Sequence, residues 1–178
     1  MIQIFFDMDG VLADFDLGVC QLFNHSGRDG GDLGKDLHTV LGCEKRFIWM
    51  QIEEKGRRFW ENIPVSKWAN ELIDVASDFG DIFIATAPSY SPNSAAGKLA
   101  WLQKKFGKRF RDYVIIPDKS LLAKPHRLLI DDSLKNCLAF KKEGGRVMHF
   151  PTYANGGLTT GLDPIGILKQ TLQEMENL

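Results

Sequence analysis

The 178-residue chain has few cysteines, and the three that it has lie far apart in the sequence. Cys20, Cys43 and Cys137 form no CxxC pair, and their number is odd. Structural zinc sites and disulfide frameworks use closely spaced or paired cysteines, so we expect neither here. The pattern fits three small side chains in a reducing compartment, and it predicts a cytoplasmic location.

Long hydrophobic runs and an excess of one charge are also missing. The N-terminal apolar run, Ile2–Phe6, is too short for a signal peptide and ends at an acidic residue. No stretch approaches the length of a membrane span. Lysine plus arginine number 22 and aspartate plus glutamate 23, which gives a net charge of -1. Because proteins that bind long nucleic acids carry a basic surface, we expect neither a membrane nor a long nucleic acid as a partner.

Five short apolar runs predict the strands of a parallel sheet, at residues 2–6, 81–85, 113–116, 127–130 and 146–150. Most of them lack strict alternation, which is typical of strands covered on both faces. Helical periodicity occurs between most of these runs, at 68–79, 95–106, 134–143 and 164–175. Ser66 is the expected N-cap of the first of these helices, and the third begins after Ser133. Strands that alternate with helices predict a doubly wound, Rossmann-like α/β fold.

Residues 15–64 interrupt this alternation of strands and helices. The pattern there is mostly helical, with a glycine-rich break at 27–34, and it follows the first strand. We therefore predict an α/β core made of residues 1–14 and 65–178. Residues 15–64 would form a small helical cap over the active site, with Asp14 capping its first helix.

Polar residues follow four of the five predicted strands. In chain order they are Asp7 with Asp9, then Thr86, then Lys119, then Asp131 with Asp132. Ligands of open parallel sheets bind outside the carboxyl ends of the strands, so we expect these side chains to meet. Crowded carboxylates favour a divalent cation with oxygen ligands such as Mg²⁺, and a lysine balances a phosphate dianion. The constellation predicts phosphoryl transfer with an aspartate nucleophile.

Several segments resemble the motifs of one superfamily. DMDGVLADF at 7–15, IATAP at 84–88 and LIDD at 129–132 resemble the first, second and fourth motifs of the haloacid dehalogenase superfamily. Within it, the chain is most similar to the 5'(3')-deoxyribonucleotidases and their phage and bacterial relatives. FWENIP at 59–64 and GKLAWL at 97–102 carry that closer similarity. The resemblance implies the superfamily's α/β fold, magnesium and phosphatase activity.

The resemblance also implies a role for each acidic residue of these motifs. Asp7 would be the nucleophile and a magnesium ligand. Asp9 would be the general acid and base, and its backbone carbonyl would bind the metal. Asp131 would be a side-chain ligand of magnesium, and Asp132 would support the metal through water.

The phosphate would be held by Thr86, by the amide of Ala87 and by a lysine. Two lysines compete for the last position. Lys119 in Asp-Lys-Ser is similar to the Asp-Lys-Thr of the deoxyribonucleotidases, whereas Lys124 resembles the Lys-Pro of other superfamily branches. We favour Lys119, because phage-type relatives carry a similar extra loop before their Asp-Asp pair.

Four further residues are candidates for substrate binding. Phe15, Phe59 and Trp60 could stack on a nucleobase, since every base has a π-face, and the alternative for each is a place in the core. Lys98 could reach the phosphate from a helix N-terminus, and the alternative is a solvated side chain.

The sequence therefore predicts a magnesium-dependent phosphomonoesterase that acts on (deoxy)ribonucleoside monophosphates through an aspartyl-phosphate. One alternative is a phosphatase for another phosphoester, such as a sugar phosphate or a nucleic-acid 3'-phosphate. Another is a non-catalytic binding relative, against which Asp9 argues because a pure binder has no need of it. The sequence leaves open the base, the choice of 5' or 3' phosphate, and the oligomeric state, a homodimer included.

Overall fold

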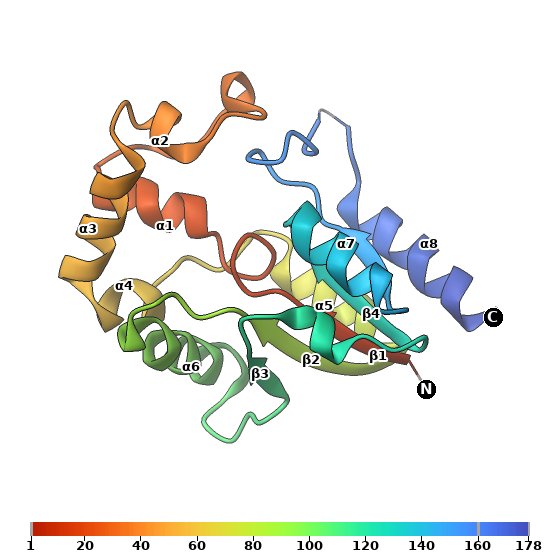
Figure 1. Ribbon diagram of the computed structural model, residues 1–178. Helices are drawn as coiled ribbons and strands as arrows, with labels where there is room; N and C mark the ends of the chain where they lie inside the picture. The colour runs from red at the N-terminus through yellow and green to blue at the C-terminus, as the bar shows by residue number, and fades with distance from the viewer. Residues whose placement is uncertain (1, 160, 178) are drawn as a thin grey trace.

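The computed structural model describes residues 2–159 and 161–177, which contain a five-stranded, fully parallel sheet (Figure 1). The strand order is β3-β2-β1-β4-β5. The strands are β1 (Ile2–Phe6), β2 (Gly80–Thr86), β3 (Tyr113–Ile115), β4 (Arg127–Asp131) and β5 (Arg146–His149). The chain adds strands on one side of β1 and then on the other, so β1 is the point where the strand order reverses. The predicted doubly wound sheet is confirmed.

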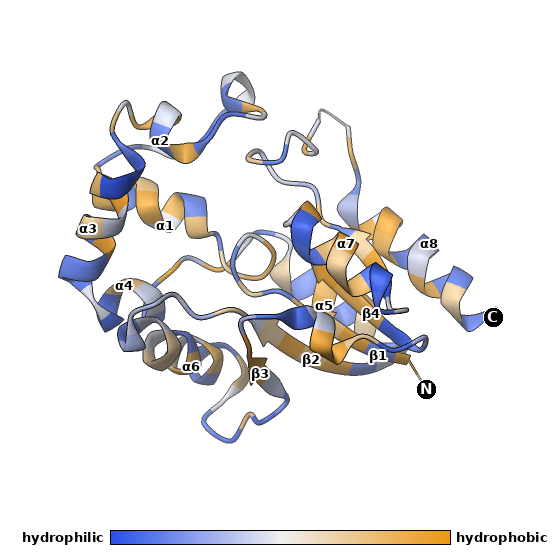
Figure 2. Ribbon diagram, in the orientation of Figure 1, coloured by the Kyte–Doolittle hydropathy of each residue, from blue (hydrophilic) through white to orange (hydrophobic). Residues whose placement is uncertain are grey.

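Two apolar layers cover the sheet, one on each face. Ile4, Phe6 and Ile130 belong to the larger layer, which includes residues of α5 (Ala69–Ser77) and α8 (Pro164–Glu176). Phe5 and Leu129 alternate with them and pack on the other face with Phe140 of α7 (Leu134–Lys142). Figure 2 shows these hydrophobic strands between helices that carry many hydrophilic residues. Within the described residues, no helix is both long enough and apolar enough to cross a membrane.

The core helices differ in how they begin. Helix α7 begins after Ser133, as predicted, and the Ser133 hydroxyl caps it by accepting a hydrogen bond from the Asn136 amide at 3.4 Å. The predicted cap of α5 is wrong, because this helix follows Trp68 and the Ser66 hydroxyl bonds the Trp68 amide. Helix α6 (Pro92–Phe106) begins at a proline after Ser91, earlier than the predicted start at residue 95.

Residues 15–64, all of them described by the structure, form helices and no strand. The helices are α1 (Phe15–Leu22), η1 (Gly30–Asp32), α2 (Leu37–Val40), α3 (Lys45–Lys55) and α4 (Arg57–Glu61). The Asp14 carboxylate caps α1 by accepting a hydrogen bond from the Leu17 amide at 2.9 Å, as predicted. Figure 1 shows these helices beyond the carboxyl end of the sheet, and α4 contacts α6. The Gly34 amide donates to the Tyr153 carbonyl at 2.7 Å, which joins this segment to the loop after β5.

We predict that Cys43 is the first thiol to react in the folded protein. Cys20 and Cys137 are buried, whereas Cys43 is half-buried. Burial raises the pKa of the Cys20 thiol and raises that of Cys137 to about 12, so neither forms much thiolate at neutral pH. Ellman's reagent should titrate one thiol quickly in the native protein and three after denaturation. Rapid labelling of Cys137 in the native protein, seen by peptide mapping, would contradict this packing.

Candidate active site

Lys119 connects the carboxyl ends of β1 and β4. Its Nζ lies 2.7 Å from Asp7 Oδ1 and 2.6 Å from Asp131 Oδ2. Lys119 begins η2 (Lys119–Leu122), just past β3, and is 3% exposed. Burial lowers the pKa of Lys119, but the two carboxylates outweigh burial and raise this pKa above its ordinary value, so the ammonium stays charged. Lys124 is exposed, so the structure brings Lys119 rather than Lys124 to these acids.

The start of α7 fixes the position of Asp131. Its carboxylate is fully buried and accepts hydrogen bonds from the Ser133 amide at 2.8 Å and from Asn136 Nδ2 at 3.1 and 3.2 Å. The next residue, Asp132, is held through its backbone carbonyl, which accepts from Asn155 Nδ2 at 3.0 Å. Sequence reasoning assigned no catalytic role to Asn136 or Asn155, and here both position the Asp-Asp pair.

Lys98 forms a second buried ion pair, with Asp9. Its Nζ donates to Asp9 Oδ2 at 2.6 Å, to Thr86 Oγ1 at 2.9 Å and to the Ala87 carbonyl at 2.5 Å. The expectation that Lys98 acts from a helix N-terminus is wrong, because α6 begins at Pro92 and Lys98 lies in its middle. The solvated alternative is also wrong, because the side chain is 2% exposed.

The site holds more negative than positive charge. Four carboxylates meet two ammonium groups, which leaves two unbalanced negative charges when all are ionised; the groups are Asp7, Asp9, Asp131, Asp132, Lys98 and Lys119. Burial, opposed by Lys119 and helped by Asp131 and Asp9, raises the pKa of Asp7 to about 7. Burial and the charge of Asp7 raise the pKa of Asp132 to about 8. Each shift shows that a nearby positive charge would favour the ionised form.

These residues fit a divalent cation. Oxygen atoms of Asp7, Asp131 and Asp132 lie within 4.8 Å of one another. Carboxylate oxygens are the hard ligands that Mg²⁺ prefers, and the two unbalanced charges equal the charge of one such ion. The chemistry of the donors therefore agrees with the predicted magnesium site.

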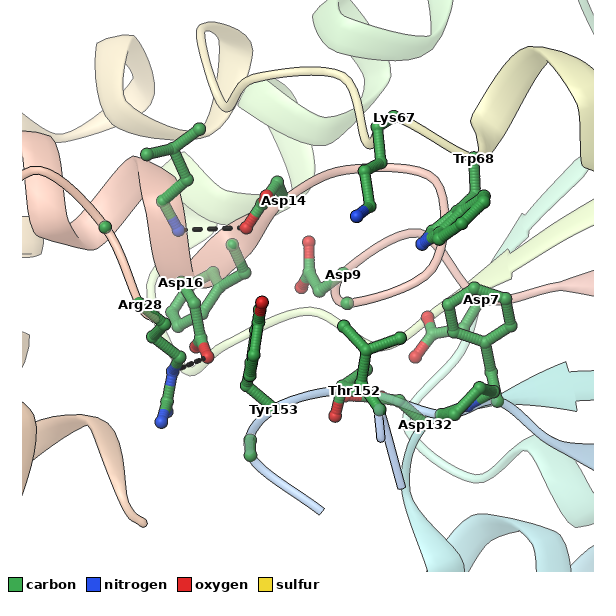
Figure 3. A pocket seen from close by; sticks show the side chains of 18 of the residues that line it. Asp7, Asp9, Asp14, Asp16, Arg28, Lys67, Trp68, Asp132, Thr152 and Tyr153 are labelled. Atoms are coloured by element: carbon green, nitrogen blue, oxygen red, sulfur yellow. Dashed lines mark hydrogen bonds and ion pairs between the residues drawn. The ribbon is translucent and has the colours of Figure 1, made fainter. Parts of the chain in front are cut away.

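A cavity of about 610 Å³ opens at Asp7, Asp9 and Asp132 and extends along α1 (Figure 3). Phe15 also lines this cavity, as a stacking role requires. Phe59 and Trp60 are buried, and in the described part of the chain neither belongs to the cavity wall. Their rings pack with that of Phe15 at centroid distances of 5.8 and 5.9 Å, so they support Phe15 from behind. Thr86 and Lys119 are likewise buried, Thr86 beside Lys98 and Lys119 beside Asp7 and Asp131.

Several residues of the cavity wall carried no prediction. They are Asp16, Arg28, Lys67, Trp68, Thr152 and Tyr153. Lys67 and Trp68 come from the segment before α5, and the Lys67 ammonium lies 4.6 Å from the centroid of the Trp68 ring. Thr152 and Tyr153 belong to the loop after β5. Loops that follow the strands of a parallel sheet lie at its carboxyl edge, and this position is the sequence signal that could have placed them at the site.

Two solved structures identify the fold of the chain. A haloacid dehalogenase-like family hydrolase from Xanthomonas campestris superposes with a TM-score of 0.56 at 13% identity, over 100% of this chain and 99% of that one. A HAD family hydrolase from Deinococcus radiodurans, solved with bound phosphate and sodium, gives 0.53 at 12% identity, over 83% and 79%. At these identities the likeness establishes the haloacid dehalogenase-like fold.

Sequence comparison identifies the family of the chain. The family model described as "5' nucleotidase, deoxy (Pyrimidine), cytosolic type C protein" matches residues 1–159, and the chain belongs to this family. A Staphylococcus epidermidis protein named "Putative 5'(3')-deoxyribonucleotidase" is 30% identical over 157 residues, which are 82% of this chain and 81% of that protein. The mitochondrial 5'(3')-deoxyribonucleotidase of Mus musculus is 28% identical over 153 residues and 74% of this chain. This chain spans 64% of the length of that mouse protein. The family resemblance read from the motifs is thus confirmed.

We predict that Gly10→Ala destabilises the protein by more than its backbone conformation alone requires. Gly10 has a φ of +82°, and an added Cβ would lie 2.4 Å from Asp132 Oδ2. The left-handed conformation costs a non-glycine residue about 1–2 kcal/mol, and the contact adds to that cost. Gly144→Ala is the matched control, because its φ is +86° and no described atom lies within 4 Å of the added Cβ. Chemical denaturation should show a larger loss for Gly10→Ala, and equal losses would contradict the contact with Asp132.

We predict that the metal-free protein loses stability as the pH rises through neutrality. The folded-state pKa values of Asp7 and Asp132, about 7 and about 8, lie above the ordinary value of 3.8. Raised carboxyl pKa values stabilise the fold below the unfolded-state pKa, and this stability is lost as the pH rises through the folded-state values. In the presence of a chelator, the free energy of unfolding should fall between about pH 5 and about pH 9. The free energy of unfolding of the Asp132→Asn variant should fall less steeply over the same range. A steeper fall for Asp132→Asn would contradict these shifts.

Proposed function

We propose that this chain is a magnesium-dependent phosphomonoesterase that dephosphorylates (deoxy)ribonucleoside monophosphates through an aspartyl-phosphate. The observation that carries the proposal is that Asp7, paired with Lys119, lines a nucleotide-sized cavity together with Asp9. Membership of a 5'-nucleotidase family supports the same reaction. The deoxyribonucleotidase names of the similar proteins support nucleotides as the substrate class.

In the first step Asp7 attacks the phosphorus atom. Its Oδ1 is already bonded by Lys119 and by the Met8 amide, both at 2.7 Å. We assign the attack to Oδ2, because no donor among the described residues bonds that oxygen. The bond from phosphorus to the sugar oxygen breaks as the new bond forms. Asp9 gives its proton to that sugar oxygen, and the nucleoside leaves.

In the second step water hydrolyses the aspartyl-phosphate. Asp9 takes a proton from water, the water oxygen bonds to phosphorus, and the bond from phosphorus to Asp7 breaks. Asp9 Oδ2 accepts a hydrogen bond from Lys98, and the Asp9 side chain is 26% exposed and lines the cavity. We therefore assign proton transfer in both steps to the Asp9 carboxylate.

The residues around these two acids would hold the metal and the phosphoryl oxygens. Asp7, Asp131 and Asp132, with the backbone carbonyl of Asp9, would hold Mg²⁺. When bound, the metal supplies positive charge that favours an ionised Asp7 and a developing charge on the phosphoryl group. Thr86 Oγ1 accepts from Lys98, which leaves its own O–H to donate to a phosphate oxygen.

The helical segment 15–64 would act as the cap that encloses the nucleoside. Phe15 lines the cavity from this segment, next to the catalytic loop, so its ring is placed to stack on the base. The hydrogen bond between Gly34 and Tyr153 ties the segment to the core loop opposite, which limits the space to a small substrate. A mononucleotide fits this enclosure better than a polymer.

We predict magnesium-dependent release of phosphate from nucleoside monophosphates by the purified chain. The panel should contain deoxy- and ribonucleotides, sugar phosphates and a 3'-phosphorylated oligonucleotide. Asp7→Asn should reduce release by about 10⁴-fold or more, because the nucleophile is lost while the shape of the side chain is kept. Chelation of the metal should lower release to a similar background, and added Mg²⁺ should restore it.

Asp118→Asn is the matched control for the loss of one carboxylate. Asp118 precedes Lys119, but its side chain is exposed and bonds only Ser120 among the described residues. Its activity should stay within about twofold of the parent. If phosphate is released faster from sugar phosphates than from nucleotides, sugar phosphates would replace nucleotides as the proposed substrate. No release from any substrate would overturn the proposed reaction.

A further inference from the structure

The wall of the cavity is rich in carboxylates, although the proposed substrate is an anion. Five aspartates line it, namely Asp7, Asp9, Asp14, Asp16 and Asp132. Among the described residues, the wall has two cationic side chains, those of Arg28 and Lys67. A phosphate dianion that enters this cavity is repelled by the carboxylates, so a free positive charge on the wall would favour its entry.

The charge of Arg28 is already engaged by protein groups. Its Nε pairs with the Asp16 carboxylate, and its Nη1 donates a hydrogen bond to the Lys35 carbonyl at 2.7 Å. Its side chain is 3% exposed. The buried lysines of the site, Lys98 and Lys119, are likewise paired with carboxylates and do not belong to the described cavity wall. These three cations therefore add little free positive charge to the cavity.

Lys67 follows a segment whose backbone is hydrogen-bonded to the catalytic loop after β1. The Asp14 amide donates to the Pro64 carbonyl at 2.8 Å, and the Ser66 amide donates to the Leu12 carbonyl at 2.9 Å. Between these bonds the two segments form an antiparallel bridge. The backbone that leads to Lys67 is thus fixed against the loop that carries the proposed acid and base.

The ammonium of Lys67 keeps its charge available to a ligand. Lys67 is exposed, and its side chain forms no ion pair or hydrogen bond with any described residue. Its Nζ lies 4.6 Å from the centroid of the Trp68 ring, and the face of an aromatic ring attracts an ammonium. Figure 3 shows the side chain pointing toward the cavity, with Asp9 and Trp68 on either side in this view.

We propose that Lys67 is a phosphate-binding residue, which donates hydrogen bonds to the phosphoryl group of the substrate and to the phosphate product. This inference rests on the proposed function, because the substrate and the product of that reaction are both phosphate anions. Lys119 is buried beside Asp7, whereas Lys67 approaches from the open side of the cavity. An ammonium recognises the charge of a phosphate and not the base, so Lys67 would strengthen binding of every substrate alike.

The first test removes the charge of Lys67 and measures kcat and KM separately. Lys67→Gln should raise KM by about tenfold, both for a nucleoside monophosphate and for p-nitrophenyl phosphate, because a charge-assisted hydrogen bond is lost. kcat should stay within about threefold of the parent, since the ammonium holds the ground state and the transition state equally well. Lys67→Arg keeps the charge and should return KM to within about threefold of the parent.

Lys45→Gln is the matched control. It removes the charge of an exposed lysine at the start of α3, away from the cavity wall, and KM should stay within about twofold of the parent. The two glutamine variants have the same net charge, yet KM of Lys67→Gln should depend less on ionic strength, because salt screens the contact that it lacks. Equal KM values for the two variants, or a fall in kcat with KM unchanged, would overturn the inference.

Binding of inorganic phosphate separates this inference from the proposed reaction. Calorimetric titration of each protein with phosphate, in the presence of Mg²⁺, requires no turnover. A dissociation constant about tenfold higher for Lys67→Gln than for Lys45→Gln supports the inference, even where the substrate panel shows no hydrolysis. Equal dissociation constants, or no binding of phosphate by the parent protein, overturn it, even where nucleotides are hydrolysed.

Discussion

The contact on which the site depends is the buried ammonium of Lys119 between Asp7 and Asp131. Two carboxylates at the ends of neighbouring strands would repel each other, and taking them out of water costs further free energy. Lys119, 2.7 and 2.6 Å from the two acids, offsets both costs without neutralising the whole cluster. The negative charge that remains is what suits the site to a divalent cation.

The parallel topology delivers this arrangement from distant parts of the sequence. Lys119 lies 12 residues from Asp131 and reaches it from η2, and Lys98 lies 89 residues from Asp9. The sheet brings the ends of β1, β2 and β4 together, and the start of α7 adds Asn136 as a neutral support. Asp7 and Asp9, the two acids of the proposed reaction, thus each have one cationic partner that keeps the carboxylate oriented.

The sequence predicted the strands and the polar residues at their ends, because buried parallel strands have a clear apolar pattern and their ends must share one edge. It did not predict the environment of Lys98, because an earlier helix start at Pro92 moves this residue from the first turn into the buried middle of α6. The pair of Asp16 and Arg28 was also missed. Arg28 lies in a glycine-rich loop without periodicity, so only its tertiary contacts show that it faces the cavity.

The central claim is that the Asp7 carboxylate becomes phosphorylated, and trapping this intermediate tests it most directly. The protein would be mixed with magnesium and a nucleoside monophosphate that it hydrolyses, quenched in acid during turnover, reduced with borohydride and mapped by mass spectrometry. Reduction converts an aspartyl-phosphate to homoserine, so the account predicts homoserine at position 7 and none in a sample without substrate. Phosphate release without any modification of Asp7, or with homoserine at another aspartate, would contradict the account.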